Sequence, residues 1–171
     1  LLFSICSHAQ SLAALQACQT ALGLAVNPKL HSAQQQLVNL ETQREHVLRV
    51  LMDWSVWLGQ APNPTLVQQA MRIVPQAKAS WFKKGKAFSL DSELTNAVMD
   101  RLDVWDIFLE THLFAMPVEE WNKLNTLKAL QAWIDVQATL PAKTLAQLQQ
   151  QDLASLGANA FDLNQETSVL K

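Results

Sequence analysis

The sequence predicts an all-α protein, a helical bundle built on two long adjacent helices. Apolar residues make up 49% of the 171 residues, and glycine and proline number only 4 and 6. Few helix breakers among many good helix formers favour long helices. Apolar side chains also recur at spacings of three, four and seven, which is the period of a helix with one buried face. We expect a single helical domain over residues 1–171, a fragment of a longer chain.

The first predicted helix runs from about residue 7 to residue 24. Six residues share its broad apolar face: Leu12, Leu15, Ala17, Cys18, Ala21 and Leu22. Cys18 is therefore expected to be a small core residue. The pair Asn27-Pro28 should end this helix, because the residue before proline avoids helical backbone angles.

The second predicted helix is the longest, from about residue 31 to residue 58, and Gly59 stands where a helix-ending glycine belongs. Its apolar positions recur at helical spacing: Leu37, Leu40, Val47, Leu51, Trp54 and Leu58. Charged residues Glu41, Arg44, Glu45 and Arg49 lie between them. We expect a solvated, salt-bridged face here, with Glu45 and Arg49 as an i,i+4 pair.

The third and fourth predicted helices occupy the middle of the chain. Asn63 is a good N-cap and Pro64 a good first helical residue, so a helix should run to about residue 84. Pro75 should kink or split it. The next helix should open at Ser89 or Asp91 and stop at the pair 116–117.

Three shorter helices should follow. A short one begins at Pro117, another is capped by Asn125 or Thr126 and runs through Val136, and a third opens at Pro141 and reaches about residue 151. From Leu156 on the helical period is lost, which predicts irregular chain with at most one short strand.

Charge and cysteine usage exclude several functional classes. The net charge of −2 does not indicate a positively charged surface that would bind nucleic acid. The lysines at 83, 84 and 86 are expected to form the solvated end of a helix. Residues 1–28 carry no charge, but polar side chains interrupt the run well short of a membrane span. Two cysteines form neither a CxxC motif nor a disulfide framework, which indicates a reducing cytoplasm.

The sequence contains few residues in an arrangement typical of a catalytic or metal-binding site. Cys6-Ser7-His8 places a thiol near an imidazole, but a metal site needs three or four converging ligands, and a nucleophile needs a third orienting group. Glu41 and Glu45 are one turn apart, as in a paired-carboxylate site, but with Arg44 and Arg49 they fit a solvated, salt-bridged helix face. His46 beside Val47 fits an interior histidine. The tryptophans are spread over several helices and fit core packing: Trp54, Trp57, Trp81, Trp105, Trp121 and Trp133. By these residues alone the chain is a helical domain of undetermined function.

The N-terminal segment resembles the signature of the nickel–iron hydrogenase large subunit, R-x-C-G-x-C-x-x-x-H followed by an Ala/Leu-rich helix and a P-x-N-A turn. Residues 1–15 lie along it without a gap; Cys6 matches the second cysteine and Pro28 the proline of the turn. Residues 40–54, 113–121 and 160–171 resemble segments of a degenerate subfamily, the hydrogenase expression and formation proteins of the HupK/HoxV type.

The chain departs from the signature at several positions, and one of them is a metal ligand. Leu1 replaces its arginine, Phe3 its first cysteine, Gln10 its histidine and Leu30 the asparagine of the turn. In the family four thiolates hold nickel and iron, and an apolar ring cannot replace a thiolate ligand. A C-terminal cysteine pair is not among these 171 residues. The resemblance therefore implies a protein that is not an enzyme.

What the resemblance implies instead is a non-catalytic accessory role in hydrogenase maturation, in the cytoplasm. Its partners would be maturation proteins or the hydrogenase large subunit, with no nucleic acid and no membrane. Cys6 would contact the iron of a transient iron–cyanide–carbonyl group, and Glu45 and His46 would border that site. Two alternatives stay open: a structural helical domain that binds protein without metal, and an active hydrogenase large subunit.

Overall fold

The described residues form an all-α fold, which confirms the predicted fold class. The structure is a computed structural model that describes residues 6–95 and 102–151, with only the backbone of residue 102. The elements in chain order are α1 (Ser7–Ala21), α2 (Pro28–Arg49), a π-helical segment (Val50–Trp54), α3 (Ser55–Trp57), α4 (Pro64–Trp81), a 3₁₀ turn (Lys83–Gly85), α5 (Leu102–Leu109), a second π-helical segment (Glu110–Phe114), α6 (Val118–Trp121), α7 (Leu127–Val136) and α8 (Leu140–Gln150).

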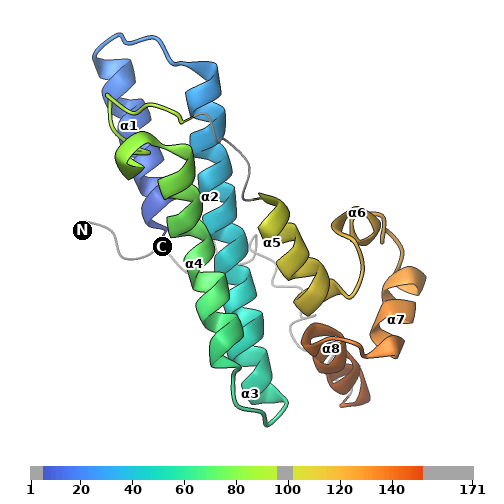
Figure 1. The fold of residues 1–171 in the computed structure, drawn as a ribbon. Helices are drawn as coiled ribbons and strands as arrows, with labels where there is room; N and C mark the ends of the chain where they lie inside the picture. The colour runs from blue at the N-terminus through green and yellow to red at the C-terminus, as the bar shows by residue number, and fades with distance from the viewer. Residues whose placement is uncertain (1–5, 96–101, 152–171) are drawn as a thin grey trace, which may run out of the picture.

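α1, α2 and α4 lie side by side as the long layer of the molecule, and α5 to α8 lie on one side of it (Figure 1). α2 passes through the π-helical segment into α3, so one helical rod covers 28–57. This is the long second helix that the sequence predicts, and it packs against α1 as expected.

The second helix begins three residues earlier than predicted, for a reason visible in its cap. The Asn27 side chain accepts hydrogen bonds from the backbone N–H groups of Lys29 (3.0 Å) and Leu30 (3.3 Å), and Pro28 is the first helical residue. Asn27-Pro28 therefore starts α2 in the same way that Asn63-Pro64 starts α4.

α4 runs without interruption through Pro75, so this proline does not split the helix. Pro75 is exposed, and the helix buries the residues on its other side against α2: Ala70, Ile73, Val74, Ala77 and Trp81. The missing proline N–H therefore falls on the solvent side, where water can satisfy the freed carbonyl.

The predicted helix start at Ser89 or Asp91 is also wrong. The chain from Phe82 to Thr95 is not helical apart from the 3₁₀ turn, and Phe82 forms an isolated antiparallel bridge with Leu94. The Ser89 N–H donates to the Ser92 hydroxyl at 2.9 Å. Such local side-chain bonds compete with helix formation. The described part of the fourth helix begins at 102.

Two apolar clusters hold the described residues together. The larger joins α2, α4 and α5 and includes the fully buried Leu37, Leu40, Val74, Trp81 and Phe82. The smaller joins α7 and α8. Trp121 bridges them, stacking on Phe114 with ring centroids 4.4 Å apart and meeting Trp133 edge-on at 4.8 Å.

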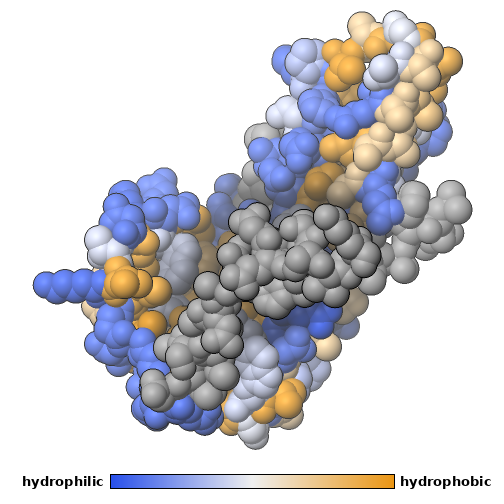
Figure 2. Space-filling view, turned by 180° about the vertical axis from the view of Figure 1, so that it is seen from behind, coloured by the Kyte–Doolittle hydropathy of each residue, from blue (hydrophilic) through white to orange (hydrophobic). Residues whose placement is uncertain are grey.

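α1 buries a narrower face than predicted. Leu12 and Leu15 are buried, whereas Ala17, Cys18, Ala21 and Leu22 are exposed. The expectation that Cys18 is a core residue is therefore wrong. Around the connection between α1 and α2, Leu22, Leu24 and Val26 are 60%, 47% and 48% exposed. Apolar residues also gather on the surface at the upper right of Figure 2.

Several sequence predictions fall outside the described residues. These are the family-signature positions at 1–5, the helix between 96 and 101, and the irregular chain and family-like segment beyond 151. Within the described part of the chain, none of the helices has the length and hydropathy needed to cross a membrane.

Candidate functional site

The N-terminus of α1 is capped by a side chain from α2. Cys6 occupies the N-cap position in a left-handed conformation (φ 53°, ψ 40°), and its own side chain caps nothing. Glu41 supplies the acceptor instead: its Oε2 accepts the His8 backbone N–H at 3.1 Å, and its Oε1 accepts the Ser7 hydroxyl at 3.2 Å. A carboxylate here satisfies free helix N–H groups and stabilises the positive end of the helix dipole.

The same carboxylate binds the His8 ring. His8 Nδ1 lies 2.5 Å from Glu41 Oε1, and the two side chains are only 14% and 5% exposed. Burial raises the pKa of the Glu41 carboxyl, but the His8 and Ser7 hydrogen bonds and the His8 charge outweigh it, so the pKa lies below its usual value. Phe88 meets the His8 ring edge-on, with centroids 5.5 Å apart. We call Ser7, His8 and Glu41 the α1 cap cluster.

The cap cluster fixes the tautomer of His8. An ionised carboxylate can only accept hydrogen bonds, so His8 Nδ1 must carry the proton that it donates to Glu41. In the neutral ring the lone pair then sits on Nε2. A histidine oriented in this way by a carboxylate is prepared to bind a metal ion or to accept a proton through Nε2.

The charged face predicted for α2 is not a uniformly solvated one. Glu41 is buried against α1, so the expectation of a salt-bridged surface is wrong for this residue. The Arg44 guanidinium nitrogen Nη2 lies 2.5 Å from Glu45 Oε1 and 3.9 Å from Glu41 Oε1. Arg49 pairs with Asp53 at 3.3 Å instead of with Glu45, because a residue one turn further along offers its carboxylate.

His46 faces a different part of the molecule from Cys6. It lines a cavity of about 370 Å³ between α2 and α5, together with Asp106, Phe114 and Trp121. Five residues separate His46 from Glu41, which turns it well away from the α1 side of α2. Burial, followed by the charges of Glu110 and Asp103, raises the pKa of Asp106. Of the three predicted site residues, the structure places Cys6 at α1, Glu45 beside Arg44 and His46 toward α5.

Both thiols are free and exposed. Cys6 stands at the start of α1, two residues before His8, and Cys18 lines a shallow groove with Phe88 and Leu90. Among the described residues no group of three or more His, Cys, Asp or Glu side chains is arranged to hold a metal ion. A metal bound at Cys6 would therefore need ligands from elsewhere in addition to nearby side chains.

Sequence reasoning treated Cys6-Ser7-His8 and Glu41 as separate weak features and missed their contact. One signal was available. Glu41 stands four residues after Leu37 and directly after Leu40, both completely buried. A carboxylate at the spacing of core residues on a helix is expected to pair with a hydrogen-bond donor or a cation, because burial of an unpaired charge costs free energy.

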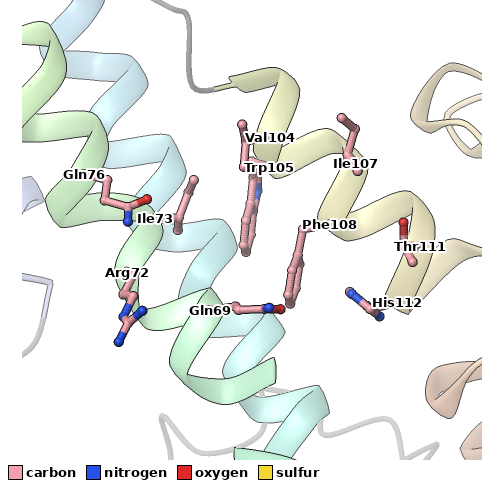
Figure 3. Close-up of a pocket in the computed structure, with 10 residues that line it drawn as sticks. All are labelled: Gln69, Arg72, Ile73, Gln76, Val104, Trp105, Ile107, Phe108, Thr111 and His112. Carbon is pink, nitrogen blue, oxygen red and sulfur yellow. The ribbon is translucent and has the colours of Figure 1, made fainter. Parts of the chain in front are cut away.

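A second cavity, of about 360 Å³, lies between α4 and α5 (Figure 3). Trp105 and Phe108 from α5 stack in parallel with centroids 5.3 Å apart, and Phe108 meets His112 edge-on at 4.9 Å. Trp105 also donates its indole N–H to Gln43 at 2.8 Å. The Trp105–Gln43 bond joins α5 to α2, whereas the ring contacts lie within α5 and the π-helical segment that continues it. None of the predicted site residues lines this cavity.

Comparison with known proteins gives one relative. Over 105 residues the chain is 41% identical to the hydrogenase expression/formation protein HupV of Azotobacter chroococcum mcd 1. That match covers 61% of this chain and 31% of the relative, so the chain spans less than a third of that protein's length. No family model and no solved structure matches the chain.

Proposed function

We propose that this protein is a non-catalytic accessory protein in the maturation of nickel–iron hydrogenase, of the degenerate large-subunit-like HupK/HoxV type. The observation that carries the proposal is the 41% identity over 105 residues to a protein named for hydrogenase expression and formation. The signature-like segments around Cys6 and at 40–54 support it independently, because they resemble the large-subunit family in order and spacing.

The first signature position supports assembly over turnover. Phe3 stands where the family has its first metal-binding cysteine. A nickel–iron site of the family's kind would lack this thiolate, which an apolar ring cannot replace. We propose that the chain works in the cytoplasm, as a single helical domain that contacts maturation proteins or the hydrogenase large subunit.

The proposed cargo is an iron–cyanide–carbonyl group held at Cys6. The Cys6 thiol is exposed on a helix start that Glu41 holds against α2, so a partner can approach it. Glu45 remains a proposed border of the site, whereas His46 lines the α2–α5 cavity on another side of α2 from Cys6 and does not belong to the proposed site. A carrier with few ligands holds its cargo weakly, which permits release.

Infrared spectroscopy tests this proposal. The protein is purified without oxygen from cells that contain the maturation machinery, and cyanide and carbonyl stretching bands are expected on it. Cys6→Ala should remove these bands, while Cys18→Ser, which alters the other exposed thiol, should retain them. Bands that persist in Cys6→Ala would overturn the iron contact, and normal hydrogenase maturation after deletion of the gene would overturn the accessory role.

A second candidate function is a helical protein-interaction domain without metal. Its supporting observation is an exposed apolar surface where the long rod ends: Val56 and Trp57 are 62% and 58% exposed, and Trp57 stacks on Trp54 at 6.1 Å. Aromatic residues are enriched in the centres of protein interfaces. This function would be favoured if Trp57→Ala blocked maturation and Cys6→Ala did not.

A further inference from the structure

Asp106 lines the cavity between α2 and α5 without a partner for its charge. Its side chain is half-buried, and among the described residues it forms no hydrogen bond or ion pair. Burial, followed by the charges of Glu110 and Asp103, raises the pKa of its carboxyl. A charge that costs the fold stability in this way is more typical of a functional site than of packing. A positive group from outside the described chain would compensate it.

The cavity around Asp106 offers a cation both an opposite charge and apolar packing. It has a volume of about 370 Å³, and its wall is largely apolar, including Leu109 and the aromatic rings of Phe114 and Trp121. No lysine or arginine is among the described residues that line it. The cavity reaches the surface, since His46 on its wall is exposed.

The second cavity, between α4 and α5, has the opposite charge character. Its volume is almost equal, at about 360 Å³, but Arg72 lines it and none of its described lining residues carries a carboxylate (Figure 3). Placing like charges together suppresses the binding of a wrong partner. A cationic group should therefore enter the α2–α5 cavity and avoid the α4–α5 cavity.

We infer that the α2–α5 cavity is a docking site for an arginine side chain of a partner protein, with the Asp106 carboxylate as its ion-pair acceptor. The choice of a protein as the source rests on the proposed function, because an accessory protein works by contact with other proteins. The volume lies at the small end of the range for ligand pockets, which suits one side chain better than a large cofactor. The cavity is separate from the proposed cargo at Cys6, on another side of α2.

Arginine fits this cavity better than lysine does. Its planar guanidinium can donate two parallel hydrogen bonds to the Asp106 carboxylate, which fixes the orientation of the partner. It is also more weakly hydrated than an ammonium group and packs on aromatic rings, which Phe114 and Trp121 supply here. Arginine is correspondingly enriched in protein interfaces, where lysine is depleted.

A titration of the 171-residue chain with short peptides, followed by NMR, tests the site. The probe is an acetylated and amidated Leu-Arg-Leu peptide, and its matched control carries citrulline, which keeps the shape of arginine without its charge. The indole N–H resonance of Trp121 should shift with the arginine peptide, and the side-chain amide of Gln76, in the α4–α5 cavity, should not. The citrulline peptide should bind about 10- to 100-fold more weakly, because it cannot form the charge-assisted bonds.

Two variants with the same chemical change assign the charge to one residue. Asp106→Asn should weaken binding of the arginine peptide to the level of the citrulline peptide. Asp135→Asn removes an exposed carboxylate from α7, outside the cavity, and should bind as the unmodified chain does. Circular dichroism checks that both variants are folded. The comparison of the two peptides uses the unmodified chain, so it tests the site even where a variant does not fold.

Several results would overturn the inference. No binding, equal binding of the arginine and citrulline peptides, unchanged affinity in folded Asp106→Asn, or a shift at Gln76 in place of Trp121 would each remove the site. A Leu-Lys-Leu peptide that bound as tightly would overturn the choice of arginine, and equally tight binding of methylguanidinium alone would overturn a protein as the source. Peptide binding as expected in a chain that is dispensable for hydrogenase maturation would overturn the proposed function and leave the docking site standing.

Discussion

Gln34 and Ala87, separated by 53 residues of sequence, are joined by a hydrogen bond of 2.7 Å from the side-chain Nε2 to the backbone carbonyl. Both residues are almost completely buried, at 2% and 1% exposure. This bond fastens the non-helical segment 82–95 to α2. Since Phe88 of that segment packs on the His8 ring, Gln34 also supports the α1 cap cluster from a distance.

Gln34→Ala should destabilise the fold by about 1–3 kcal/mol, because the buried Ala87 carbonyl loses its donor. The free energy of unfolding, measured with urea and tryptophan fluorescence, checks this. Gln35→Ala is the matched control, because Gln35 is exposed and its side-chain Nε2 donates to Asn39 in the same helix, not to the 82–95 segment. Equal stability of the two variants would show that the bond to Ala87 contributes nothing.

Glu41→Gln should lower stability by about 1–3 kcal/mol at neutral pH, since it removes a charge-assisted bond to His8. The contribution of Glu41 to the free energy of unfolding should decrease on acidification. The pKa of Glu41 in the folded chain lies below its ordinary value of 4.5, so its contribution is complete above that value. The contribution is then lost as the pH falls through the folded pKa.

Urea unfolding at a series of pH values measures this effect. The stability gap between the unmodified chain and Glu41→Gln should narrow as the pH falls below 4.5, because the Glu41 carboxylate is then progressively protonated in the folded chain. Glu120→Gln, a change of an exposed glutamate in α6, should show no such narrowing gap. A gap that widens on acidification would contradict the assigned ion pair.

Helical periodicity predicts most of the fold, and the failures have a common physical origin. Asn63-Pro64 was interpreted as a helix start, and the structure confirms it. Asn27-Pro28, the same dipeptide, was interpreted as a helix end, although its asparagine caps α2. The dipeptide alone carries no information about which side the helix lies on. Likewise, the Ser89 turn depends on a bond to Ser92 that periodicity does not describe.

The candidate site was less predictable, because its central contact is non-local. His8 and Glu41 lie 33 residues apart and meet only when α1 packs on α2. Local spacing paired Glu41 with arginines of its own helix, which is the ordinary outcome for a surface helix. Only the three-dimensional packing shows that Glu41 faces α1 while His46 faces α5.

Two equally buried tryptophans should respond differently to the same substitution. Trp81 and Trp105 are 0% and 2% exposed, but the Trp81 indole N–H has no acceptor among the described residues, whereas that of Trp105 donates to Gln43. Trp→Phe removes a similar volume at both positions. At Trp105 it also removes a hydrogen bond of about 0.5–1.5 kcal/mol, and at Trp81 it removes an unsatisfied buried donor.

Trp105→Phe should therefore destabilise the protein more than Trp81→Phe does. Thermal unfolding followed by circular dichroism gives the comparison, because the helical signal does not depend on which tryptophan is removed. If Trp81→Phe proved the more damaging of the two, the Trp81 indole N–H would have to be bonded in solution.

Asp106→Asn should stabilise the protein at neutral pH. Burial and the neighbouring charges of Glu110 and Asp103 raise the pKa of Asp106, so its ionised form is disfavoured in the folded chain. A like-charge pair at helical spacing costs about 0.2–0.5 kcal/mol, which sets the size of the expected gain. The gain should disappear at acid pH, where Asp106 is protonated and carries no charge to remove.

Glu119→Gln separates this effect from a general reduction of negative charge. Glu119 is exposed and lies in the first turn of α6, where a carboxylate interacts favourably with the helix dipole. Its replacement should therefore give no gain in the urea unfolding free energy, although both variants lose one negative charge. Stabilisation by Glu119→Gln equal to that by Asp106→Asn would mean that net charge, and not the surroundings of Asp106 beside the α2–α5 cavity, sets the effect.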